Sequence, residues 1–166
     1  MTNTSSLAAG FIKELEAEAV STHKCLEKIP ESAFDYKPHP TSMTLGYLSQ
    51  LVAEIPLWIA YMIEKGEIDL ATFHNEIKTD KKLVDFFDDN MNRAKNALQQ
   101  ASEASFSKVF YLKTSGKTVF SATTADYIGP TINLWVHHRG QLTVYMRMKE
   151  IPVPAIYGPS GDDKNF

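Results

Sequence analysis

The feature that most constrains the fold of this chain is a long helical pattern at residues 130–159, which ends in a proline-rich segment: PTINLWVHHRGQLTVYMRMKEIPVPAIYGP. Its apolar positions recur every three or four residues, the spacing of one face of an α-helix. On this spacing His138 lies within the apolar stripe, whereas His137 points about 100° away from it. The stripe comprises Thr131, Trp135, His138, Leu142 and Tyr145. The segment therefore predicts a long helix with an imidazole on its apolar face.

Three more helices are predicted by the same periodicity, over residues 5–28, 44–65 and 80–101, and the last helix is expected to begin at Thr124 or Asp126. Pro56 lies inside the second pattern and should bend that helix, because proline cannot donate a hydrogen bond to the carbonyl of Val52. Residues 109–113 and 117–121 are β-prone and predict a short hairpin. We expect an all-α fold of one domain over residues 1–166, with a small β-hairpin before the last helix.

Composition and charge place the chain among ordinary soluble proteins. It has 166 residues, of which 43% are hydrophobic and 22% charged, and its net charge is −3. Its basic residues are scattered, so we expect no nucleic-acid partner. The most apolar run contains Glu54 and Pro56 and is too short to span a bilayer, and the N-terminus lacks a basic leader region. Cys25 is the single cysteine. A cytoplasmic protein without a membrane partner is the expectation.

Two sequence blocks resemble the DinB family. HHRGQL at residues 137–142, followed by VPAIYGPS at 153–160, resembles the C-terminal signature of these proteins. The block IPESAFDYKPHPTSMTLGYLSQLVAEIP, residues 29–56, resembles their first loop and second helix. The resemblance covers nearly the whole chain. It implies a four-helix bundle and a protein that is often a homodimer.

The resemblance also implies a metal site, in which DinB-like proteins commonly hold a divalent ion with three histidines. Aligned by motif, those positions are Leu51, Leu134 and His138 here. Leucine cannot bind a metal, and a single imidazole rarely holds one without other donors. We therefore expect no cofactor, with weak binding of zinc, nickel or iron at His138 as the alternative. A pocket there would be lined by Leu51, Glu54, Leu134, His137 and Gln141.

His138 can be interpreted in two ways. As a remnant ligand or general base, it would act with Glu54, His137 or water. As a structural residue, it would form a hydrogen bond with a buried group such as Ser49 or Tyr61. We favour a DinB-like protein with a degenerate metal site that serves as a small-ligand-binding or structural homodimer. The alternative is a metal-dependent thiol transferase or hydrolase that uses His138 with substitute ligands and whose catalytic residues are unknown.

Several remaining polar residues have structural interpretations. Glu14 and Glu18, four residues apart on the first helix, are expected to be solvated surface charges. Arg139, on the polar side of its helix, can pair with a carboxylate of a neighbouring helix, and Gly140 would allow another helix to approach closely. The terminal YGPSGDDKNF lacks the pattern of a phosphate loop, so we interpret it as a turn and tail.

Overall fold

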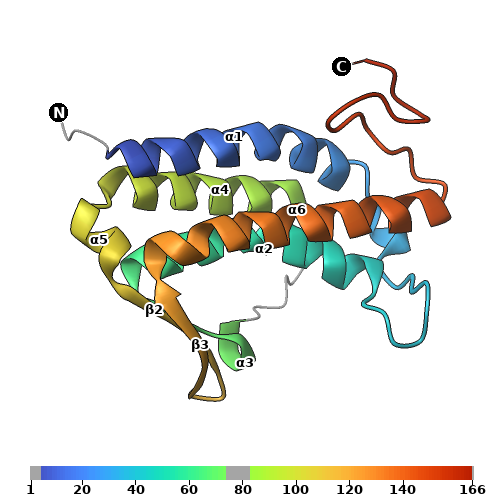
Figure 1. The fold of residues 1–166 in the computed structure, drawn as a ribbon. Helices are drawn as coiled ribbons and strands as arrows, with labels where there is room; N and C mark the ends of the chain where they lie inside the picture. Colours follow the sequence, from blue (N-terminus) through green and yellow to red (C-terminus); the bar gives the residue numbers. More distant parts are fainter. Residues whose placement is uncertain (1–4, 74–82, 166) are drawn as a thin grey trace.

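The computed structural model describes residues 5–73 and 83–165, and within them the protein is mostly helical (Figure 1). The long helices are α1 (Ser6–Leu26), α2 (Leu45–Glu64), α4 (Leu83–Gln100) and α6 (Thr124–Met148). Shorter helical turns are η1 (Glu31–Ala33), α3 (Leu70–Phe73) and α5 (Glu103–Ser107). Residues 80–82 of the third predicted helix lie outside the described residues. None of the described helices has both the length and the apolarity needed to cross a membrane.

Hydroxyl side chains cap three of the long helices at their N-termini. The side chains of Ser5, Thr44 and Thr123 each accept a hydrogen bond from the backbone N–H three residues later. At the other end of α2, Gly66 adopts a φ of 73°, and its N–H donates to the carbonyl of Tyr61. These capping residues explain why the boundaries of α1 and α2 and the start of α6 lie within two residues of the predicted ones.

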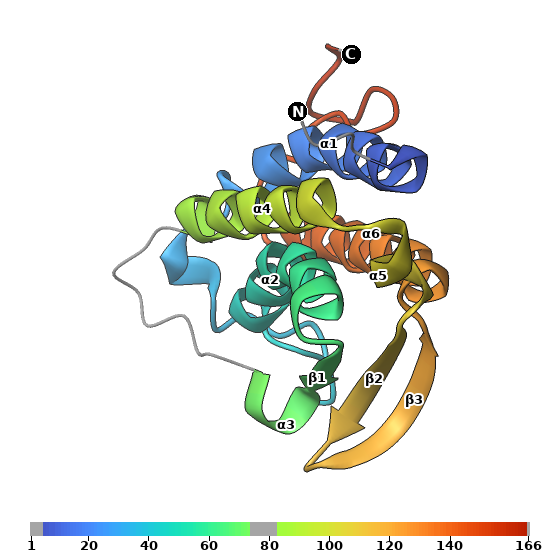
Figure 2. The same ribbon diagram turned by 90° about the vertical axis from the view of Figure 1, so that its left-hand side faces the viewer.

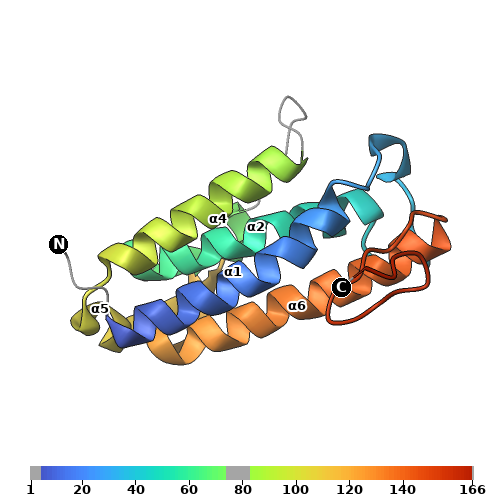
Figure 3. The same ribbon diagram turned by 90° about the horizontal axis from the view of Figure 1, so that it is seen from above.

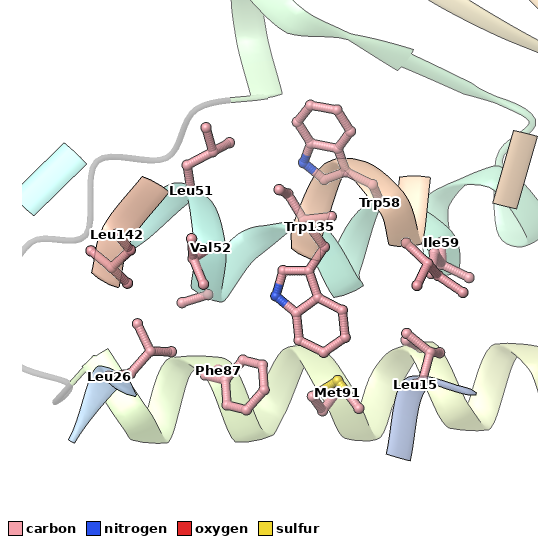
Figure 4. Close-up of a cluster of buried hydrophobic side chains, with 14 of the residues drawn as sticks. Leu15, Leu26, Leu51, Val52, Trp58, Ile59, Phe87, Met91, Trp135 and Leu142 are labelled. Carbon is pink, nitrogen blue, oxygen red and sulfur yellow. The ribbon is translucent and has the colours of Figure 1, made fainter. Parts of the chain in front are cut away.

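The long helices pack so that α2 contacts α4 and α6, and α1 contacts the same two helices. In Figure 3, which views the molecule from above, α1 lies in front of α2, with α4 on one side of α1 and α6 on the other. The core between them is centred on Trp135, whose ring lies 5.9 Å from that of Phe87 (Figure 4). From α2, Val52 and Ile59 point towards α4, whereas Leu51 and Trp58 point away from it. Within the described residues, the buried Trp135 Nε1 has no hydrogen-bond partner.

A small sheet lies at one side of the helices (Figure 2). The predicted hairpin is confirmed: β2 (Val109–Thr114) pairs antiparallel with β3 (Lys117–Thr123). A third strand, β1 (Glu67–Asp69), pairs parallel with β2 and was not predicted, because three residues are too few to show a strand period. The Asp69 carboxylate accepts hydrogen bonds from the N–H groups of Ser115 and Gly116, which ties β1 to the hairpin turn.

Candidate functional site around His138

The face of α6 that turns into the core differs in one respect from the predicted stripe. Trp135, Arg139 and Leu142 are buried, whereas His138 is only half-buried and His137 is exposed. Thr131 and Tyr145 are buried as the stripe predicts, but in its middle the guanidinium group of Arg139 takes the buried position in place of the imidazole of His138. His138 lies at the border between this buried face and solvent.

His138 forms its hydrogen bond within its own helix. Its Nδ1 atom lies 3.3 Å from Oε1 of Gln141, one turn further along α6. Neither Ser49 nor Tyr61, the partners considered from the sequence, takes this role, and the Ser49 hydroxyl donates instead to the carbonyl of Leu45. Desolvation lowers the pKa of His138 below its usual 6.5, an effect that the bond to Gln141 partly opposes. The imidazole is therefore held in its neutral form at neutral pH.

The other predicted lining residues have separate surroundings. Leu51 belongs to the apolar core, and Leu134 packs against that core. Glu54 is buried, and its Oε1 accepts a hydrogen bond of 3.1 Å from Nε1 of Trp58 on the same helix. Burial raises the pKa of Tyr47, and the charge of Glu54 adds to this effect. Glu54 and His138 each form a hydrogen bond with a residue of their own helix.

The donor chemistry of these residues does not fit a three-histidine metal site. Leu51 and Leu134 have no atom able to bind a cation. The ring centroids of His137 and His138 are 5.2 Å apart, but neighbouring residues on a helix point in directions about 100° apart. Among the described residues, no group of three or more histidine, cysteine, aspartate or glutamate side chains is arranged to hold a metal ion.

Comparisons with known proteins agree on one family. A sequence model of the DinB family matches residues 1–164. The chain is 30% identical to the uncharacterized protein YrdA of Bacillus subtilis, over 92% of this chain and 89% of YrdA. The chain belongs to the DinB family. Its fold is similar to that of the DinB-like protein YjoA of Bacillus subtilis, with a TM-score of 0.67, 20% identity, and coverage of 86% of this chain and 96% of YjoA.

A second crystal structure shows the same likeness. The DinB-like protein of Bacillus cereus ATCC 10987 superimposes with a TM-score of 0.68 over 90% of this chain and 97% of its own, at 20% identity. At this identity the likeness establishes the fold alone. This DinB protein therefore shares its architecture with these two proteins, and any activity has to be argued from its own residues.

In this DinB protein the two halves of the C-terminal signature meet in one polar cluster, which we call the Arg139 cluster: Arg139, Glu18, Thr22 and Tyr157. Nη2 of Arg139 lies 2.6 Å from Oε2 of Glu18, and Nη1 donates to the Glu18 carbonyl at 2.9 Å. The Tyr157 hydroxyl accepts from Nη2 at 2.7 Å and donates to Oε2 of Glu18 at 2.8 Å. The cluster joins α1, α6 and the segment that follows α6.

Three sequence expectations fail at this place, one of them in part. Glu18 is not a solvated surface charge, because its carboxylate balances a guanidinium group whose side chain is only 2% exposed. Gly140 does not serve a close helix contact, because a Cβ atom built on it meets nothing within 4 Å. The expected pairing of Arg139 with a carboxylate of a neighbouring helix is confirmed, but Arg139 is buried and does not lie on the polar side of α6. Its partner was missed because Glu18 lies 121 residues away and glutamate is ordinarily exposed, although Glu18 shares the helical spacing of Leu15 and Thr22.

Proposed function

We propose that this DinB protein does not use the three-histidine metal chemistry of its family and instead acts as a non-catalytic protein, a homodimer that binds a small molecule or serves a structural role. We also infer that its four long helices form the family's four-helix bundle. One observation supports the proposal most: at the positions aligned with the family's ligands, Leu51 and Leu134 are part of the apolar packing and His138 is bonded to Gln141. A bound cation there would meet hydrocarbon on two sides.

The second candidate is a divalent-metal-dependent thiol transferase or hydrolase. It is favoured by the lowered pKa of His138, because a neutral imidazole can bind a metal or accept a proton. This candidate requires further donors close to His138. Glu54, the carboxylate that the sequence suggests as a substitute donor, accepts a hydrogen bond from Trp58, and this engagement is why we prefer the non-catalytic role.

Elemental analysis distinguishes the two candidates. Tag-free protein purified without chelator and dialysed is expected to contain zinc, nickel and iron far below one equivalent, because the donor set is incomplete. His138→Ala should leave this content unchanged, as should the control His39→Ala in an exposed loop. Near-stoichiometric metal that is lost in His138→Ala and kept in His39→Ala would refute the non-catalytic proposal and justify assays with thiol and hydrolytic substrates.

Sedimentation analysis tests the homodimer. Twice the chain mass of 18.6 kDa is expected at micromolar concentration. A mass of 18.6 kDa throughout the concentration range would refute the dimeric assembly and leave a monomeric protein.

A further inference from the structure

A groove with a volume of about 430 Å³ lies between α1 and α4, away from the residues considered so far. Figure 3 shows the two helices side by side, and among the described segments no ribbon crosses the seam between them. The volume falls within the ~300–1,000 Å³ that is typical of small-molecule pockets. Residues of α2 and α6 do not line it.

The floor and one wall of this groove are apolar. Ala19, Phe87 and Met91 form part of its floor, and the last two are almost completely buried. Val20 stands beside them with 60% of its surface exposed. An exposed valine next to a buried aromatic ring and a thioether gives a ligand an apolar surface to cover.

The two ends of the groove carry charges that are arranged differently. At one end Lys95 Nζ lies 2.5 Å from Oε1 of Glu16, so these two charges neutralise each other. At the other end His23 lies between two carboxylates, with Nδ1 3.7 Å from Glu27 and Nε2 3.6 Å from Asp88. One imidazole cannot neutralise two carboxylates, so this end is negative whatever the protonation state of His23.

We propose that the groove binds a small molecule with an apolar body and a single ammonium group. The apolar body covers Val20 and Met91, and the ammonium group lies beside Asp88. A carboxylate in the same place would be repelled, whereas a cation gains an attraction that is strengthened by the apolar floor. The proposal rests on the proposed function, because it gives the small-ligand role a place and a ligand class. The two proposals can be refuted independently, because the metal content that tests the proposed function does not depend on this groove.

The test uses three six-carbon compounds with different head groups: hexylamine, hexan-1-ol and hexanoate. Each is titrated into the ¹⁵N-labelled full chain at pH 7.5 while the backbone amide signals of Ala19, Val20 and Met91 are followed. Hexylamine is expected to shift these signals with a Kd about tenfold lower than that of hexan-1-ol, which corresponds to about 1.4 kcal/mol. Hexanoate is expected to bind more weakly than the alcohol.

Two pairs of variants assign the contacts. Asp88→Asn should lower the affinity for hexylamine to that for hexan-1-ol. Asp85→Asn, on an exposed part of α4 outside the groove, should leave the affinity for hexylamine unchanged. Val20→Ser should lower the affinity for all three compounds several-fold. Val144→Ser, at an exposed site on α6, should leave all three affinities unchanged.

Three outcomes would overturn the proposal. Equal binding of hexanoate and hexylamine would show that charge does not select the ligand. An unchanged affinity in Asp88→Asn would place the ammonium group elsewhere. Shifts of the same signals with protein concentration alone, and none with hexylamine, would show that a second copy of the chain occupies the groove.

Discussion

Arg139 combines a buried charge with a complete set of partners. Its guanidinium group contacts the Glu18 carboxylate and carbonyl, the Thr22 hydroxyl at 3.2 Å and the Tyr157 hydroxyl. Removing a charge from water costs several kcal/mol, and only close, well-oriented partners recover that cost. The exposed pair of Arg93 and Glu64 has a similar distance of 2.7 Å but keeps much of its hydration. Burial, and not distance, distinguishes the two ion pairs.

This difference predicts unequal effects of removing the two arginines. Arg139→Met should lower the free energy of unfolding by about 3 kcal/mol, because it leaves the Glu18 carboxylate without its counter-charge. Arg93→Met should lower it by about 1 kcal/mol or less. Urea unfolding of both variants measures the difference. In a double-mutant cycle, Glu18→Leu should cost less in the Arg139→Met background than in the wild type. Equal losses for the two arginine variants would contradict this account.

At the scale of elements, the segment from 151 to 165 is held onto the helices rather than hanging free as a tail. Asp162 Oδ2 accepts a hydrogen bond of 2.8 Å from the Val153 N–H and lies 2.6 Å from Nη1 of Arg147. Asp163 Oδ2 accepts one of 3.1 Å from the Ala155 N–H. The GPSGDD sequence therefore folds the segment back on itself, and Tyr157 attaches it to α1 and α6.

Acid is expected to loosen this segment. The bond from Arg147 lowers the pKa of Asp162, and the bond from the Ala155 N–H lowers the pKa of Asp163, both from an ordinary 3.8. Because the folded pKa values lie below the unfolded ones, the stabilisation is complete above pH 3.8 and is lost as the pH falls through the folded values. The amide signals of Val153 and Ala155 should therefore move towards unfolded positions as the pH falls below 3.8.

The control for this prediction removes the titrating groups. In the double variant Asp162→Asn, Asp163→Asn, the two amide signals should show no such pH dependence, whereas Asp35→Asn, in the loop before α2, should behave as the wild type. Far-UV circular dichroism recorded on the same samples separates release of the segment from loss of the helices. A local release would be contradicted if the native amide positions and the helical circular dichroism signal were lost at the same pH in the wild type, the double variant and Asp35→Asn.

At the scale of the whole molecule, the long helices and the sheet contribute to one contiguous core. Buried residues from α1, α2, α4, α6, β1 and β2 belong to a single cluster that extends to Ile151 and Val153 after α6. Asn90 of α4 donates a 3.0 Å hydrogen bond to the Ala53 carbonyl of α2, so a polar contact also joins the two helices. Because these four helices, β1 and β2 share one core, none of them could unfold without disturbing its neighbours.

We therefore predict one cooperative unfolding transition for residues 1–166. Trp58 packs on Phe73 of α3 with ring centroids 5.9 Å apart, and Trp135 packs on Phe87 of α4, so the two indoles report on different parts of the core. Fluorescence of Trp58→Phe and of Trp135→Phe should each give the same urea midpoint as circular dichroism of that variant. Separate midpoints for fluorescence and circular dichroism would show that the chain contains more than one domain.

The sequence by itself determined the family, through the resemblance of residues 29–56 and 137–160 to DinB proteins. It also determined most helix boundaries and the hairpin, because periodicity, capping hydroxyls and turn glycines act between residues a few positions apart. It also placed Leu51 and Leu134 at apolar positions and His138 near the core. Only the tertiary structure decided that Arg139 is buried with Glu18 and that β1 joins the hairpin. Both depend on contacts between residues tens of positions apart, and such contacts leave no periodic signal in the sequence.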